Sequence, residues 1–104
     1  MATKQIVLIT GASAGLGYQA VRSLSSSSIP YDIIVSGRTP SKVEAAIKSA
    51  QEEYPSSHSS LHALQLDIES DDSIDKAVKE MSSKFDRIDV LVNNAGLHFF
   101  RSAL

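Results

Sequence analysis

Short apolar runs alternate with helix-like segments along this chain. Four runs, at residues 6–9, 33–35, 61–67 and 88–92, have the length and composition of strands. The first, second and fourth are continuously apolar, which is typical of strands buried on both faces. The third partly alternates between apolar and polar residues, which favours a place nearer the edge of a sheet.

Three segments between these runs show the spacing of helical faces. The first ends in the serine run 25–28. The second begins at Thr39-Pro40, a hydroxyl residue at the N-cap followed by proline at the first helical position. The third follows Ser70 and has two aspartates in its first turn, where carboxylates complement the helix dipole. The expected apolar faces are Leu16, Ala20, Val21 and Leu24, then Val43, Ile47 and Ala50, then Ile74, Val78, Met81 and Phe85.

The resulting order, β-α-β-α-β-α-β, predicts a parallel sheet with right-handed crossover helices. A chain of 104 residues corresponds to one domain or less. The serine-rich stretch at 55–60 is a polar loop of this domain rather than a linker. We therefore expect an α/β fold of the Rossmann-like, doubly wound kind.

Composition excludes several functions. The net charge is −2 and no basic stripe is present, so neither nucleic acid nor an anionic membrane is an expected partner. The chain has no cysteine, which removes disulfides and thiolate metal sites. His58, His62 and His98 lack acidic or histidine neighbours at ligand spacing, so no metal site is expected. The N-terminal apolar run is too short for a signal peptide, and we expect a cytoplasmic protein.

Gly11, Gly15 and Gly17 stand between the first strand and the first helix. A helix N-terminus presents unpaired N–H groups and the positive end of the helix dipole, and glycines let a diphosphate approach the backbone. The alternative is a strand-to-helix turn that needs glycine for its backbone angles alone. The Gly-x-x-x-Gly-x-Gly spacing differs from both the Gly-x-Gly-x-x-Gly fingerprint and the P-loop.

Three motifs in this sequence resemble those of the short-chain dehydrogenases/reductases. Residues 10–17 match the family's TGxxxGxG loop, and residues 93–96 match its NNAG motif. Asp67-Ile68 matches the acidic pair that follows the third strand. The resemblance covers residues 5–96 and implies the strand order 3-2-1-4. It also implies that residues 1–104 form the N-terminal half of an NAD(P)-binding Rossmann domain, truncated at the C-terminus.

The resemblance implies a role for each motif position. Gly11 allows the tight turn, Gly17 lets the helix pack on the sheet, and Asn93 helps to hold the central strands. The expected cofactor contacts are Ser13, Gly15 and Leu16 along the diphosphate and ribose, Asp67 and Ile68 beside the adenine, and Asn94, Ala95 and Gly96 beside the nicotinamide ribose.

The end of the second strand indicates which dinucleotide is bound. A carboxylate there would bind a ribose 2′-hydroxyl and repel a 2′-phosphate. The sequence instead reads Ser36-Gly37-Arg38, and the arginine can pair with a phosphate through its fork of donors. Ser13 and Ser36 are expected to add hydrogen bonds. We therefore predict NADP(H) rather than NAD(H), although Ala14 stands where many relatives carry a basic residue.

The family's catalytic Tyr-x-x-x-Lys pair is not found in this chain. Neither Tyr18, Tyr31 nor Tyr54 is followed four residues later by lysine, and no catalytic residue is assigned. Arg22 does follow Tyr18 at that spacing, and we interpret the two as a surface stacking pair. The chain is thus expected to be the cofactor-binding half of an oxidoreductase that acts on a small carbonyl or alcohol.

Two alternatives stay open at this point. The chain can be a non-catalytic module that binds a dinucleotide or a partner protein, or a nucleotide-binding fold of another class, such as a methyltransferase. The half-fold would leave the segment 88–94 as an exposed apolar edge, which invites pairing with another chain. An oligomer is therefore compatible with the sequence.

Overall fold

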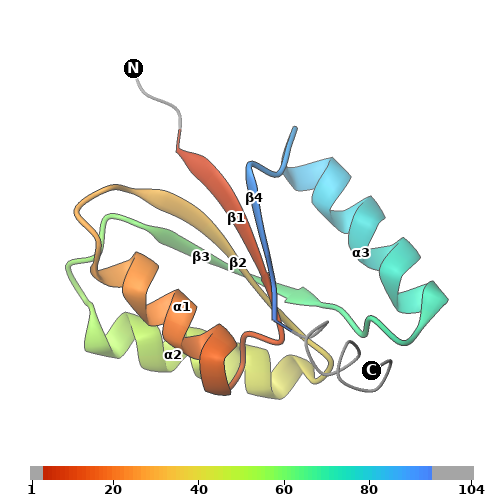
Figure 1. The fold of residues 1–104 in the computed structure, drawn as a ribbon, viewed down its shortest axis with the longest axis horizontal. Coiled ribbons are helices and arrows are strands. Elements are labelled where there is room, and N and C mark those ends of the chain that lie inside the picture. Colours follow the sequence, from red (N-terminus) through yellow and green to blue (C-terminus); the bar gives the residue numbers. More distant parts are fainter. Residues whose placement is uncertain (1–3, 95–104) are drawn as a thin grey trace, which may run out of the picture.

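The fold alternates strands and helices in the predicted order. The computed structural model describes residues 4–94. Its elements are β1 (Gln5–Thr10), α1 (Gly15–Ser26), β2 (Tyr31–Gly37), α2 (Pro40–Glu53), β3 (Ser60–Gln65), α3 (Asp71–Lys84) and β4 (Val90–Asn93). The strands are parallel and lie in the order β3-β2-β1-β4. This confirms the Rossmann-like, doubly wound α/β architecture and its strand order (Figure 1).

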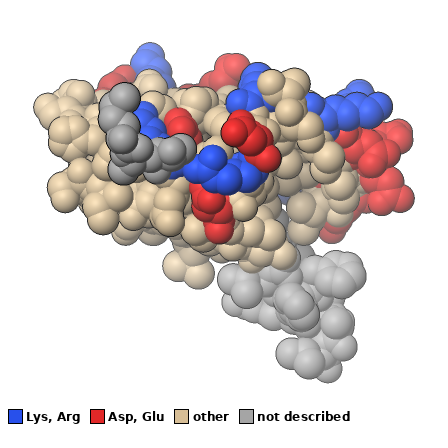
Figure 2. All heavy atoms as spheres, turned by 90° about the horizontal axis from the view of Figure 1, so that it is seen from above, with Lys and Arg blue, Asp and Glu red and all other residues tan. Residues whose placement is uncertain are grey.

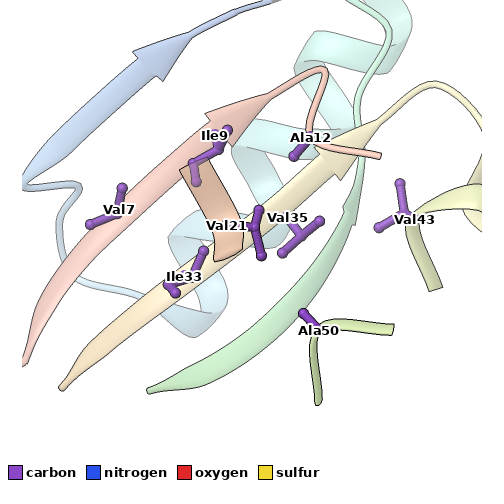
Figure 3. Packing of buried hydrophobic residues seen from close by; sticks show 8 residues of the cluster. All are labelled: Val7, Ile9, Ala12, Val21, Ile33, Val35, Val43 and Ala50. Atoms are coloured by element: carbon purple, nitrogen blue, oxygen red, sulfur yellow. The ribbon is translucent and has the colours of Figure 1, made fainter. Parts of the chain in front are cut away.

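The core occupies both faces of the central strands β1 and β2. Successive side chains of a strand point to opposite faces, so Val7 and Ile9 face α1 and α2, whereas Ile6 and Leu8 face α3. This explains why β1 is apolar at each position from Ile6 to Ile9. The cluster on the α1 and α2 side is drawn in Figure 3 and consists of Val7, Ile9, Ala12, Val21, Ile33, Val35, Val43 and Ala50.

Helix α3 covers the opposite face less completely than its pattern predicts. Ala77 is its buried residue, and Met81 and Phe85 pack against the cluster on that face. Val78, which the pattern placed on the inner face, is 51% exposed, so that prediction is wrong. The helix approaches the sheet through the small side chain of Ala77, and Val78 lies about 100° further around the helix.

Strand β4 differs from its prediction in both bounds and burial. Val90 and Leu91 are 40% and 58% exposed, so β4 is not a strand buried on both faces. It lies at the edge of the sheet, with β1 as its neighbour, and this confirms the expected apolar edge. The register with β1 begins at Val90, and Asp89 just before it is also bonded to Ile6. Its N–H donates to the Ile6 carbonyl at 2.9 Å, and its carboxylate accepts from the Ile6 N–H at 2.8 Å.

Helices α2 and α3 begin at the positions that their capping residues predict. The Ser70 hydroxyl accepts a hydrogen bond from the backbone N–H of Ser73 at 3.2 Å and caps α3, as predicted. Thr39 is the N-cap of α2 and Pro40 its first residue, but the Thr39 hydroxyl makes no capping bond among the described residues. Its backbone carbonyl accepts from the N–H of Val43 instead.

A side-chain pair between β2 and β3 was not predicted. His62 Nε2 lies 2.9 Å from Asp32 Oδ1, and the imidazole ring meets the ring of Phe85 edge-on at 5.1 Å. His62 is paired in register with Ile34, so Asp32 is its diagonal neighbour on the adjacent strand. Sequence spacing did not indicate this pair, because only the register of β2 against β3 brings Asp32 beside His62.

Candidate functional site

The predicted site residues gather at the carboxyl ends of the four parallel strands. β1 leads through residues 11–14 into α1, and the ends of β2, β3 and β4 lie at the same edge of the sheet (Figure 1). Ligands of open α/β sheets bind outside this edge. The fold thus brings the three sequence motifs to the place where a nucleotide site is expected.

The glycines of the loop serve two different purposes. Gly15 has a φ of +61°, in the left-handed region that other residues rarely adopt. Gly17 is buried, and a Cβ added there would lie 2.9 Å from the carbonyl carbon of Gly11 and closer still to its oxygen. The first turn of α1 can therefore pack on the loop only because residue 17 has no side chain. Gly11 also has a positive φ, of +58°.

The N-terminus of α1 is open toward the edge of the sheet. Its N-cap is Ala14, no described side chain caps it, and its first turn contains no acidic residue. A Cβ built on Gly15 would meet no atom of the described residues within 4 Å. Leu16 is 73% exposed, so its assignment to the apolar face of the helix is wrong. The amide groups of this turn are thus accessible to an anion, which the helix dipole would also attract.

Hydrogen bonds hold the glycine loop between the ends of β2 and β4. The N–H of Ala12 donates to the carbonyl of Ser36 at 2.8 Å. From the other side, Asn94 Nδ2 donates to the carbonyl of Gly11 at 3.3 Å. The Thr10 hydroxyl donates to Asn93 Oδ1 at 3.2 Å, which links β1 to β4. The TGxxxGxG and NNAG motifs are therefore in direct contact, while Ala95 and Gly96 lie outside the described residues.

The end of β2 carries a cation and no carboxylate. Arg38 is exposed directly after β2, and the Oγ of Ser13 lies 3.6 Å from the position of a Cβ on Gly37. The hydroxyl of Ser36 is buried and donates to the carbonyl of Ile9 at 2.7 Å. The expectation that Ser36 contributes to a cofactor site is wrong, because its side chain points into the sheet.

Asp67 and Ile68 follow β3 in a turn that packs beside β2. The N–H of Leu66 donates to the carbonyl of Gly37 at 2.9 Å, which fixes this turn next to the end of β2. The N–H of Asp67 donates to the hydroxyl of Ser73 at 2.8 Å, and its Oδ1 accepts from the N–H of Glu69. Asp67 and Ile68 are both half-buried, so part of each side chain faces the site edge or solvent.

Arg22 lies away from this edge and has a partner that the sequence did not predict. Its guanidinium forms a forked ion pair with Glu53 of α2, in which Nε lies 2.8 Å from Oε1. The pair raises the pKa of Arg22, and hydrogen bonding from Arg22 lowers the pKa of Glu53. The sequence predicted Tyr18 as the partner of Arg22, whereas the ion pair with Glu53 ties the last turns of α1 and α2 together.

Other kinds of site find little support in residues 4–94. No group of three histidine, aspartate or glutamate side chains there lies close enough to hold a metal ion. No helix in that part of the chain is both long and apolar enough to cross a membrane. On the face drawn in Figure 2, basic and acidic side chains are interspersed rather than gathered by sign.

Comparison with known proteins agrees with the motifs. The family model described as short chain dehydrogenase matches residues 5–103. The short-chain dehydrogenase/reductase tropE of Talaromyces stipitatus is 35% identical over 97 residues, which are 93% of this chain and 36% of that protein. A short-chain dehydrogenase of Penicillium roqueforti, anuI, is 38% identical over 92% of this chain and 36% of its own length. The chain therefore spans about a third of the length of these relatives.

Solved structures show the same likeness. Menthone neomenthol reductase from Mentha piperita superposes with a TM-score of 0.80 at 28% identity, over 89% of this chain and 32% of that one. The N-domain of a bacterial malonyl-CoA reductase, solved with NADP, gives a TM-score of 0.77 at 32% identity, over 86% of this chain and 16% of that one. The family model, rather than the shared fold, decides against the methyltransferase alternative. Motif order, strand order and the family model agree, and the chain belongs to the short-chain dehydrogenase family.

Proposed function

We propose that residues 1–104 form the dinucleotide-binding part of an NADP(H)-dependent short-chain oxidoreductase. The reaction is the transfer of hydride between the nicotinamide and a carbonyl or alcohol carbon, and the cofactor supplies this chemistry when bound. The open N-terminus of α1, at the sheet edge that also carries Arg38, supports the proposal most strongly. It offers unpaired amides for a diphosphate beside a cation for a further phosphate.

The chain's own residues bind and orient the cofactor in this proposal. The amides of the first turn of α1 receive the diphosphate, and the bare backbone at Gly15 lets it approach. Asn94 holds the loop from the β4 side through its bond to the Gly11 carbonyl. The proposed contacts are Ser13, Gly15 and Leu16 with the diphosphate and ribose, Asp67 and Ile68 with the adenine, and Asn94, Ala95 and Gly96 with the nicotinamide ribose.

The preference for NADP(H) rests on the end of β2. A carboxylate at this position would oppose a 2′-phosphate, but residues 36–38 contain none. Arg38 is exposed there and free to present its planar donors to a phosphate, and Ser13 lies at the same edge. The related N-domain of malonyl-CoA reductase was solved with NADP, which agrees with this choice.

Binding of the two dinucleotides to an Arg38→Asp variant tests the proposal. Hydrogen bonds to a charged group contribute about 1.5–3 kcal/mol, so the affinity for NADPH should fall roughly 10- to 100-fold. The affinity for NADH should change little, because NADH lacks the 2′-phosphate. Lys48→Asp, on the exposed side of α2, makes the same change of charge away from the site and is the control. Equal losses for NADPH and NADH would refute phosphate recognition by Arg38.

Turnover is not proposed for these residues by themselves. The family's Tyr-x-x-x-Lys pair transfers the proton in its reaction, and residues 1–104 contain no such pair. Of the described tyrosines, Tyr18 lies in the first turn of α1, Tyr31 begins β2 and Tyr54 follows α2, and none is followed four residues later by lysine. We therefore propose cofactor binding as the function of this chain, with the substrate left unassigned.

A second candidate function follows from the exposed edge of the sheet. β4 presents Val90 and Leu91 to solvent, and the described elements leave its outer side uncovered. Exposed apolar edge strands pair readily with other chains. The alternative is thus a dinucleotide-binding module that docks another protein on β4 and performs no chemistry. Measuring the molar mass of the purified chain by light scattering, with and without NADPH, tests whether the protein docked on β4 is a second copy of this chain.

A further inference from the structure

The two serine-rich segments meet at the end of the molecule opposite the glycine loop. The residues that follow α1 and the loop between α2 and β3 both lie at the amino ends of the strands, on the left in Figure 1. Between them are two adjoining hollows of about 430 and 360 Å³. Both hollows are lined by Ser25, Tyr54, Pro55 and Ser57, and we call them together the serine hollow.

The buried hydroxyl of Ser25 indicates that the serine hollow holds a ligand. Its side chain is 2% exposed, yet its hydroxyl is the one buried side-chain polar atom among residues 4–94 that has no hydrogen-bond partner. Native proteins satisfy the large majority of buried polar groups, and each exception needs an explanation. Because Ser25 lines both parts of the serine hollow, a molecule bound there can supply the missing partner.

Neighbouring hydroxyls are held in place with their protons free. The Oγ atoms of Ser27, Ser57 and Ser59 accept hydrogen bonds from the backbone N–H groups of Ile29, Ser59 and Tyr31 at 3.1, 3.1 and 3.0 Å. A serine hydroxyl that accepts in this way still has its own O–H to donate. The serine hollow therefore offers several fixed donors around the unpartnered hydroxyl of Ser25.

The electrostatics of the serine hollow disfavour an anion. The C-terminal ends of α1 and α2 both reach it, and these are the negative ends of the helix dipoles. Glu53 is the carboxylate in its lining, and the forked pair with Arg22 offsets that charge. Among residues 4–94, neither lysine nor arginine lines either part. Tyr54 and Pro55 add a ring face and an apolar surface.

We propose that the serine hollow binds a small, neutral, polyhydroxylated molecule of about monosaccharide size, with Ser25 as its buried hydrogen-bond partner. The volume lies in the range of small-molecule sites. Fixed hydroxyl donors match a ligand that is itself rich in hydroxyl groups. The lining's carboxylate, Glu53, is offset by its ion pair with Arg22, which agrees with a neutral ligand. This site is separate from the proposed cofactor site, which lies at the opposite edge of the sheet.

A titration followed by amide NMR tests the proposal, with D-glucose, glucose 6-phosphate and glucosamine as neutral, anionic and cationic probes. We expect glucose to shift the amide signals of residues 25–29 and 54–60, and the phosphate to shift them less at equal concentration. Ser25→Ala should abolish the glucose shifts and leave NADPH binding unchanged. Ser49→Ala, an equivalent change on the exposed side of α2, should preserve the shifts.

Three results would overturn the proposal. One is the absence of saturable shifts with any probe. Another is an equal response of Ser25→Ala and the unsubstituted chain, which would mean that Ser25 takes no part. The third is stronger binding of either charged probe than of glucose. Thermal unfolding provides an independent readout, since glucose should raise the unfolding midpoint of the unsubstituted chain but not of Ser25→Ala.

Discussion

Replacing Gly17 by alanine should destabilise the fold, although alanine is the better helix former. The added Cβ would lie 2.9 Å from the carbonyl carbon of Gly11 and 3.0 Å from the Cα of Ala12. Both neighbours are backbone atoms, so no side-chain rotation can relieve the collision. The Ala12 N–H is bonded to Ser36 and the Gly11 carbonyl to Asn94, so the loop cannot move without breaking these bonds.

The change in the free energy of unfolding caused by Gly17→Ala follows from two opposing effects. Overpacking by one methyl group typically costs 1–3 kcal/mol, and a rigid backbone neighbour puts this site at about 3 kcal/mol. Alanine regains about 1 kcal/mol of helix propensity relative to glycine. The free energy of unfolding should therefore fall by about 2 kcal/mol. For a domain of this size that corresponds to an unfolding midpoint lower by roughly 10 °C.

Urea unfolding followed by circular dichroism measures the effect. Ser23→Ala, at an exposed position of α1, is the matched control and should unfold within about 0.5 kcal/mol of the unsubstituted chain. A Gly17→Ala chain as stable as the unsubstituted one, or more stable, would refute the close approach of α1 to the glycine loop. It would also remove the structural reason for glycine at this position.

Gly15→Val should abolish NADPH binding in a fluorescence titration, because its side chain fills the open space before α1; unchanged affinity would mean that this glycine serves only the turn. The hydrogen bond from Ile6 and the contact with Arg87 lower the pKa of Asp89, so its carboxylate stabilises the fold above its usual pKa. The gap in unfolding free energy between Asp89→Asn and the unsubstituted chain should therefore shrink as the pH falls below about 4, and a pH-independent gap would contradict this. Leu91→Lys should reduce self-association in sedimentation experiments with little loss of stability; undiminished association would place the contact elsewhere.

Side-chain contacts between neighbouring strands could not be predicted from the sequence. Asp32 and His62 are 30 positions apart, and only the register of β2 against β3 makes them neighbours. Ser36 shows the same limit, because its place at the end of a strand suggested a cofactor contact while the sheet turned its hydroxyl toward Ile9. Such pairings depend on which face of a strand each residue occupies.

The sequence by itself determined the seven elements, their order, the parallel topology and the glycine loop before α1. These features are encoded locally, in apolar periodicity, capping residues and glycine spacing, and they needed no knowledge of distant partners. Only the tertiary structure decided that Ala77 rather than Val78 faces the sheet, that Leu16 is exposed, and that Ser25 is buried without a partner. Burial depends on which surfaces the neighbouring elements cover, and the pattern of apolar residues along the sequence does not specify which surfaces these are.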